Sequence, residues 1–145
     1  MSLKKVPDGV RPPPIAGLRH VALRVADIER CEKFYVDLLA YRVEWRPDPD
    51  NVYLSCGVDN LALHRSDKPT HPGALDHIGI ILRCADDVDL WHEFLKHHNV
   101  RIKTAPKTHR DGARSFYCYD PEGNLVQMIY HPPIAREWVA DRHDQ

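Results

Sequence analysis

The sequence has no long apolar run and no excess of charge of one sign. Among 145 residues, apolar stretches such as residues 78–82 fall far short of the ~20 residues that a membrane-spanning helix needs. Twenty Lys and Arg stand against twenty-one Asp and Glu, and the basic residues form no long run. We therefore expect no membrane partner and no nucleic-acid partner. The N-terminal residues lack the apolar core of a secretory signal, which favours a cytoplasmic location.

Cysteine is scarce, and its spacing does not suggest a disulfide framework. Cys31, Cys56, Cys84 and Cys118 lie 25, 28 and 34 residues apart and form no CxxC pair. We expect reduced thiols in a reducing compartment. Hydrophobic residues make up 43% of the chain and charged residues 28%, so the chain has enough apolar material to bury a core.

An internal repeat organises the chain. The segment LRHVAL at 18–23 resembles LDHIGI at 75–80, 57 residues later. The segment VYLSCGVDNLALH at 52–64 aligns with SFYCYDPEGNLVQM at 115–128, where Asn60 matches Asn124 at an offset of 64. About seven residues are therefore inserted in the second copy, and we place them in the polar stretch 103–112. In this alignment the first-half counterpart of Gln127 is Leu63.

Each copy reads as a βαβββ unit. Period-two alternation from His20 to Val25 predicts a strand, and Asp27 is placed to cap a helix whose apolar residues recur at helical spacing through Leu39. The rest of the first copy predicts a strand at 42–45, a turn at 47–51, and hairpin strands at 52–56 and 61–65. The second copy predicts a strand at 76–82, a helix at 87–98, a strand at 100–103, and hairpin strands at 114–119 and 124–130.

These units predict an α+β fold in which two repeated βαβββ modules form a cupped mixed sheet. We expect one domain at 17–131, with modules at 17–67 and 74–131, a Pro-rich arm at 1–16 and a C-terminal tail at 132–145. A four-stranded sheet with a helix on one face leaves its other face uncovered, so two such sheets are most stable when their open faces build one cup. That arrangement puts His20, His77 and Gln127 within reach of one another.

At these residues the chain resembles the vicinal oxygen chelate superfamily, which includes glyoxalase I, extradiol ring-cleaving dioxygenases, fosfomycin-resistance enzymes, methylmalonyl-CoA epimerases and bleomycin-binding proteins. The resemblance covers residues 17–131 and rests on LRHVALRVADIERCEKFYVDLL, LDHIGIIL and DPEGNLVQM. It implies the fold described above. It leaves the reaction open, because the same scaffold hosts metal-dependent isomerases, lyases, transferases and dioxygenases as well as metal-free binders.

One stretch is similar to the closing motif of the extradiol dioxygenases. His109 is followed at the family's spacing by Phe116 and Tyr117, then by the turn Asp120–Gly123, and finally by residue 127. The family has a metal-binding Glu at this last position, whereas this chain has Gln127. The resemblance implies that His109 is an acid–base catalyst, a role that suits an imidazole near neutral pH, and that Tyr117 hydrogen-bonds a substrate oxygen.

The resemblance also implies a divalent metal held by His20, His77 and Gln127, with Fe(II) as the first choice and Mn(II), Zn(II) or Ni(II) as alternatives. A neutral amide is a weaker donor than a carboxylate, so we expect weak or substrate-assisted metal binding. Other interpretations stay open for each residue. His20 and His77 can be histidines satisfied by hydrogen bonds, His109 a solvated loop residue, and Tyr117 an ordinary strand aromatic.

Three functions follow as hypotheses. The leading one is a metal-dependent enzyme for a small-molecule substrate, with extradiol ring cleavage of a catechol as its reaction. The second is a metal-free, bleomycin-resistance-like binder whose cup is lined by Tyr53, Leu63, Phe116 and Tyr117. A glyoxalase- or epimerase-type lyase or isomerase is the third, but neither Leu63 nor Gln127 supplies the carboxylate base that it needs. We expect His64 to face the surface or the helix, and a homodimer is the default assembly.

Overall fold

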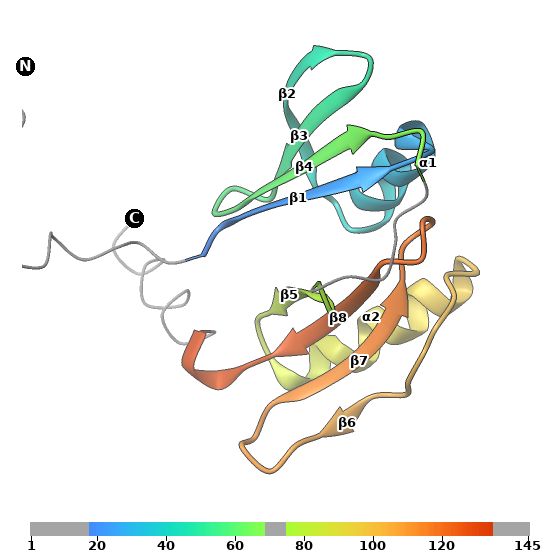
Figure 1. Ribbon diagram of the computed structural model, residues 1–145. Coiled ribbons are helices and arrows are strands. Elements are labelled where there is room, and N and C mark those ends of the chain that lie inside the picture. Colours follow the sequence, from blue (N-terminus) through green and yellow to red (C-terminus); the bar gives the residue numbers. More distant parts are fainter. Residues whose placement is uncertain (1–17, 69–74, 135–145) are drawn as a thin grey trace, which may run out of the picture.

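The computed structural model describes residues 18–68 and 75–134. They form two four-stranded mixed sheets with strand orders β1-β4-β3-β2 and β5-β8-β7-β6 (Figure 1). The first and last strands of each module pair in parallel, and the other pairs are antiparallel. This topology confirms the α+β fold of two repeated βαβββ modules. The predicted Pro-rich arm at 1–16 lies outside the described residues, as does the predicted C-terminal tail beyond residue 134.

The first module contains β1 (His20–Val25), α1 (Ile28–Lys33), the π-helix η1 (Phe34–Leu38), β2 (Arg42–Asp48), β3 (Asn51–Ser55) and β4 (Asn60–Arg65). The second contains β5 (Ile78–Leu82), α2 (Ala85–His97), β6 (Lys107–Thr108), β7 (Arg114–Tyr119) and β8 (Leu125–Tyr130). None of the helices in the described ranges has both the length and the apolar character to span a bilayer.

The helix of the first module begins as predicted, at Asp27, whose Oδ1 accepts a 3.0 Å hydrogen bond from the backbone N–H of Arg30. It then widens, because the N–H of Leu39 donates to the carbonyl of Phe34 five residues earlier. As a result the adjacent residues Phe34 and Tyr35 are both buried and meet edge to face at 5.0 Å.

One face of each sheet is covered by its helix, and we call the other the open face. In β1, Leu23 and Val25 are buried in the core, whereas His20, Ala22 and Arg24 are exposed. The second module repeats the alternation, with Ile78 and Leu82 buried while Gly79 and Ile81 are exposed. Alternating side chains along a strand point to opposite faces, so residues 20, 22 and 24 lie on one open face and residues 77, 79 and 81 on the other.

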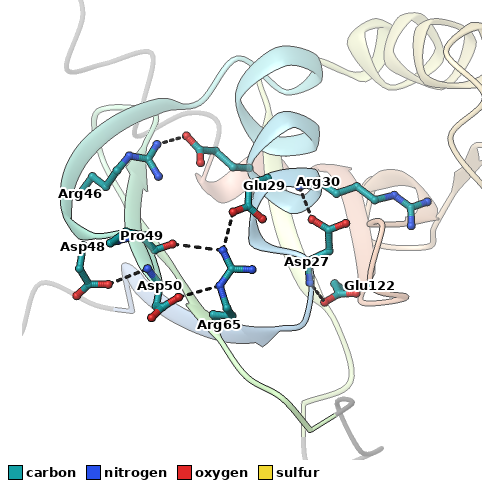
Figure 2. A network of polar contacts seen from close by, with 10 residues as sticks. Asp27, Glu29, Arg30, Arg46, Asp48, Pro49, Asp50, Arg65 and Glu122 are labelled. Carbon is teal, nitrogen blue, oxygen red and sulfur yellow. Dashed lines mark hydrogen bonds and ion pairs between the residues drawn. The ribbon is translucent and has the colours of Figure 1, made fainter.

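The two modules are joined at the turn between β7 and β8. The hydroxyl of Tyr35 donates to Oδ2 of Asp120 at 2.8 Å, and both residues are buried. Beside it, Oε1 of Glu122 accepts from the backbone N–H group of Asp27 (Figure 2) and also from that of Ala26. The turn that precedes β8 is therefore attached to the helix that follows β1. In Figure 1, β1 is the strand of the upper sheet that lies nearest the lower sheet.

The structure corrects two predicted elements. Residues 100–103 are not a strand: Ile102 forms an isolated bridge with Cys118, and the fourth strand of the sheet is β6, farther along the chain. The hydroxyl oxygen of Thr104 accepts from the N–H of Tyr117 and interrupts the ladder there. The predicted turn at 47–51 is also shorter, because β2 continues through Asp48 and β3 already begins at Asn51.

Candidate functional site

Three of the predicted site residues lie together on the open face of the second sheet. Gln127 on β8 is directly opposite Tyr117 on β7 and Gly79 on β5. The ring of His77, just before β5, meets the ring of Tyr117 edge to face at a centroid distance of 5.4 Å. Strand pairing therefore brings His77, Tyr117 and Gln127 into one patch.

A buried serine connects this patch to His109. The Nε2 group of Gln127 donates a 3.0 Å hydrogen bond to Oγ of Ser115, and Nε2 of His109 lies 3.1 Å from the same oxygen. Ser115 is 2% exposed. A hydroxyl accepts two hydrogen bonds and donates one, so the tautomer of His109 decides whether Ser115 donates to the imidazole or accepts from it. In both cases one oxygen atom positions both side chains.

Ser115 was not among the residues singled out in the sequence. The pattern that identifies it is strand alternation, because it precedes Tyr117 by two positions and must share its face. Its pairing with Ile129, two residues beyond Gln127, places it beside the patch.

A cavity of about 760 Å³ opens next to His109 and Gln127. Its volume falls within the range of small-molecule sites in proteins. The apolar part of its wall includes Ile81, Ile129 and Ile134, and its rim carries polar groups of the loop that leads into β7. The site therefore combines an apolar surface with a few polar groups that converge on it.

Arg114, which lies near His109 in the sequence, is held outside this cavity. Its guanidinium makes two hydrogen bonds to the carboxylate of Asp89 on α2, at 2.7 and 2.9 Å, and a third to the hydroxyl of Thr108. The hydrogen bonds from Arg114 lower the pKa of the Asp89 carboxyl below its usual value. Arg114 therefore anchors the edge of the sheet to α2 and does not supply a free cation to the site.

His20, the fifth predicted residue, lies on the open face of the first sheet. It is exposed, and its Nδ1 is 2.7 Å from Oδ1 of Asn60, the residue directly opposite on β4. His77 has a similar partner, since its Nδ1 is 2.5 Å from Oδ2 of Asp76. The structure thus places His20 in the first module and the other four residues in the second.

The donor chemistry of His20, His77 and Gln127 fits a metal ion. Each imidazole has its Nδ1 engaged by an oxygen atom and retains Nε2, and Gln127 donates through Nε2 and retains Oε1. Outer partners of this kind orient the ligands of metal sites. Within the two described ranges, no three His, Cys, Asp or Glu side chains are grouped so as to hold an ion by themselves. A set of metal ligands made of His20, His77 and Gln127 is therefore a proposal.

The structure corrects our prediction of which residue in the first module corresponds to Gln127. Tyr53 pairs with Ala62 as Tyr117 pairs with Gln127, so the equivalent residue is Ala62 and not Leu63. Leu63 is fully buried in the core beneath the helix-covered face. His64 consequently lies on the open face, where its Nδ1 is 2.6 Å from Oδ1 of Asn51. Our expectation that His64 would face the surface or the helix was wrong.

On the open face of the first sheet, Trp45, Tyr53 and His64 form a cluster of rings that we call the aromatic shelf. The rings of Trp45 and Tyr53 stack at 5.2 Å, the ring of His64 meets Tyr53 edge to face, and Trp45 is 59% exposed. Tyr53 thus lies on the open face, as expected. Phe116, also expected there, is fully buried on the helix-covered face, where its ring contacts His92 of α2.

Comparison with known proteins gives one family and many structures of the same fold. No curated protein matches the sequence at the required significance. The fosfomycin resistance protein FosX from Listeria monocytogenes is similar, with a TM-score of 0.69 at 19% identity over 85% of this chain and 99% of that one. The lactoylglutathione lyase from Agrobacterium tumefaciens has a TM-score of 0.66 at 22% identity over 81% of this chain and 95% of that one. A glyoxalase/bleomycin resistance protein/dioxygenase from Alicyclobacillus acidocaldarius has a TM-score of 0.65 at 24% identity over 81% of this chain and 92% of that one. At these identities the likeness concerns the fold alone.

The family model of the Glyoxalase/Bleomycin resistance protein/Dioxygenase superfamily matches residues 17–128. That range includes both βαβββ modules up to Met128 and all five predicted site residues. The sequence repeat, the two mixed sheets and the structural neighbours agree with this match. The chain therefore belongs to the Glyoxalase/Bleomycin resistance protein/Dioxygenase superfamily.

Proposed function

We propose that this protein is a metal-dependent enzyme that cleaves the ring of a small catecholic substrate by extradiol dioxygenation. The observation that carries the proposal is the hydrogen-bonded set in which His109 and Gln127 share the hydroxyl of Ser115. Tyr117 lies directly opposite Gln127. The proposed base, a proposed metal ligand and the proposed substrate-binding tyrosine are thus neighbours on one face of one sheet.

In this proposal His20, His77 and Gln127 hold a divalent ion, with Fe(II) as the first choice and Mn(II), Zn(II) or Ni(II) as alternatives. The ion supplies Lewis-acid chemistry and a template for two neighbouring oxygen atoms. Ser115 holds the amide of Gln127 so that Oε1 is free to bind. Because that oxygen is neutral, the ion keeps more positive charge than a carboxylate would leave it, which favours a dianionic catecholate.

The remaining residues handle protons and orientation. His109 accepts a phenolic proton of the substrate and returns it to the product, as its place beside the cavity allows. Tyr117 donates a hydrogen bond to a substrate oxygen. Overall, one ring C–C bond next to the two oxygens breaks and both atoms of O₂ enter the product, so the reaction needs no external reductant.

A second candidate is a metal-free protein that binds a small aromatic molecule, and the aromatic shelf favours it. Trp45 offers an exposed ring already stacked on Tyr53, a surface that another flat molecule can extend. A glyoxalase- or epimerase-type reaction has less support, because neither Ala62 nor Gln127 is a carboxylate base.

Anaerobic reconstitution with Fe(II), followed by addition of O₂ and a series of catechols, tests the enzyme proposal. We expect a yellow ring-fission product from the unmodified protein and none from His77→Ala or His109→Ala. His97→Ala, at the exposed end of α2, is the matched control and should retain activity. If Fe(II), Mn(II), Zn(II) and Ni(II) all fail to bind even with catechols present, the enzyme proposal is lost and the metal-free binder is favoured.

A single substitution tests the role of residue 127. Gln127→Glu restores the carboxylate of the family motif, so on this proposal it should strengthen Fe(II) binding. Unchanged affinity would show that residue 127 does not face the metal.

We also propose a homodimer in the cytoplasm as the working form. Each sheet ends in an exposed strand, β2 and β6, and an unpaired strand edge is a ready surface for pairing. All four cysteines are free thiols, which suits a reducing compartment. Light scattering coupled to gel filtration tests the dimer, and localisation of the tagged protein in its host tests the compartment.

A further inference from the structure

A second cavity, of about 460 Å³, lies where the two modules meet. One wall is a face of the helical segment α1–η1, and the opposite wall comes from the loop after α2 and the turn between β7 and β8. None of the five residues discussed above as base, ligands or substrate-binding tyrosine lines it. Its basic, aromatic and aliphatic lining includes Arg30, Lys33, Phe34, Leu38, Arg101 and Tyr119.

The charge of this junction cavity favours a monoanion. Arg30 and Lys33 lie on one wall and Arg101 on the other, and within the described parts of the chain no carboxylate forms an ion pair with any of the three. Figure 2 shows the side chain of Arg30 extending away from Asp27 and from the Glu29–Arg65 pair.

Two carboxylates also line the cavity. Asp120 is buried and already accepts from the hydroxyl of Tyr35, the backbone N–H groups of Glu122 and Asn124, and the side-chain amide of Asn124. Asp37 is exposed. Three cations against two carboxylates leave an excess of at least one positive charge for a ligand to neutralise, since His98, which also lines the cavity, adds no negative charge.

Arg101 has the geometry of a carboxylate receptor. Its Cζ lies 3.8 Å from the centroid of the Tyr119 ring, so the ring supports one face of the guanidinium. A guanidinium held in this way keeps its edge N–H groups in a fixed fork that matches the two oxygens of a carboxylate. The ring contact also gives the cavity a flat wall.

Apolar side chains cover much of the remaining wall, beside the polar residues His98 and Asn99. Phe34 and Leu38 come from the first module, and Val100 and Pro121 come from the second. A ligand that fits these surfaces has an apolar body beside its charged group, and the volume of the cavity suits a small organic molecule.

We propose that the junction cavity binds a small organic carboxylate with a flat apolar body, which contacts both modules at once. The proposal does not depend on the proposed dioxygenase reaction, because it uses other residues and needs no metal. Its lining includes Asp120, which accepts the hydrogen bond from Tyr35 between the modules, and Phe34, the residue before Tyr35.

Titration of the isotopically labelled full chain with naphthoate, followed by amide NMR, tests the proposal. We expect saturable shifts at Leu38, Val100 and Gly123, and no saturable shifts with the neutral analogue naphthamide. Arg101→Gln should weaken naphthoate binding about tenfold or more, because it removes a charge-assisted bidentate hydrogen bond. Lys96→Gln removes a cation from α2 outside the cavity and is the matched control, expected to bind as the unmodified protein does.

Asp37→Asn gives a result that loss of folding cannot imitate. Removal of this carboxylate leaves a larger positive excess, so naphthoate should bind about two- to fivefold more tightly. Failure of millimolar naphthoate to give saturable shifts would overturn the proposal. Equal binding of naphthamide, or shifts confined to Gly79, Ile81 and Gln127 on the open face, would overturn it as well.

Discussion

The hydroxyl of Tyr35 and the carboxylate of Asp120 form a buried hydrogen bond between the two modules, 85 residues apart in the sequence. Asp120 begins the turn that leads into the strand of Gln127, and Tyr35 belongs to the helical segment that follows the strand of His20. The bond therefore ties together the two halves that must cooperate if His20 and Gln127 act on one ligand. Burial, followed by the nearby charge of Asp120, raises the pKa of Tyr35 well above its usual value, so this hydroxyl stays protonated and donates.

Tyr35→Phe should weaken the connection between the modules. The substitution removes the donor, while Asp120 keeps its three other hydrogen bonds, so we expect a loss of about 1.5–3 kcal/mol in the free energy of unfolding, measured in urea. Tyr41→Phe is the control, because Tyr41 makes a 2.6 Å bond to Asp59 within the first module. Changes in amide chemical shift should extend into the second module for Tyr35→Phe but not for Tyr41→Phe. Shifts confined to the first module would contradict the role of the bond.

The buried thiols should make the fold sensitive to alkali. Burial, with a smaller effect of the charge on Asp120, raises the pKa of the Cys118 thiol to about 12, and burial raises that of Cys31 as well. A thiol in the unfolded chain ionises near pH ~8.5, well below the pH at which the same thiol ionises in the folded protein. As the pH rises, ionisation therefore stabilises the unfolded chain before it can occur in the folded one. The contribution of each buried thiol to the free energy of unfolding is fully present below pH ~8.5. It is lost as the pH rises toward the pKa of that thiol in the folded protein, by up to about 1.4 kcal/mol per pH unit.

Urea unfolding between about pH 8.5 and pH 10 tests this prediction, because unfolded tyrosines ionise only near pH ~10. The double variant Cys31→Ala/Cys118→Ala should lose most of the decline in stability over this interval, whatever its stability at neutral pH. Cys84→Ala, at an exposed thiol, should keep the decline. Equal slopes in the two variants would show that the buried thiols do not cause it.

Strand alternation predicted the faces of β1, β5 and β8 correctly, but in β7 Phe116 was placed in the cup beside Tyr117 although it lies on the helix-covered face. The strand β4 was assigned to the wrong face by a one-residue error. The alignment matched Asn60 with Asn124 at a constant offset. The hairpin turn, however, has four residues in the first module, 56–59, and five in the second, 120–124. A shift of one residue exchanges the two faces of a strand, which is why Leu63 was placed in the cup and His64 outside it.

The other misses have a similar local origin. The strand at 100–103 was predicted because the second copy repeats the first unit. In this edge segment, however, the N–H groups of Lys103 and Thr104 both donate to the carbonyl of Tyr117, and regular pairing resumes only in β6. Strand alternation places Ser115 on the same face as Tyr117, but its role appears only when the chain is folded and two side chains meet its oxygen. Long-range contacts of this kind cannot be inferred from a single sequence.

Ser115→Ala tests whether this serine positions the proposed metal ligand. Without the hydroxyl, the amide of Gln127 is free to rotate, and metal binding should weaken about 10- to 100-fold, as for the loss of other outer-shell partners. Isothermal titration with Mn(II) in the absence of O₂ measures the effect. Ser66→Ala, which removes a hydroxyl from an exposed loop, should bind as the unmodified protein does. Unchanged affinity in Ser115→Ala would mean that the Ser115 bond does not orient a ligand.

Trp45→Ala separates the enzyme from the metal-free binder. The substitution removes the exposed ring of the aromatic shelf but leaves the second sheet and its Ser115 hydrogen bonds untouched. If the protein is chiefly a binder, an aromatic probe such as naphthol should lose affinity by about 1–2 kcal/mol in metal-free buffer, the range expected for one stacked aromatic pair and the apolar area that it covers. Leu90→Ala, which trims an exposed apolar side chain on α2, is the control. If the probe binds Trp45→Ala and the unmodified protein equally, the shelf is not its site, and the metal-dependent reaction is then favoured.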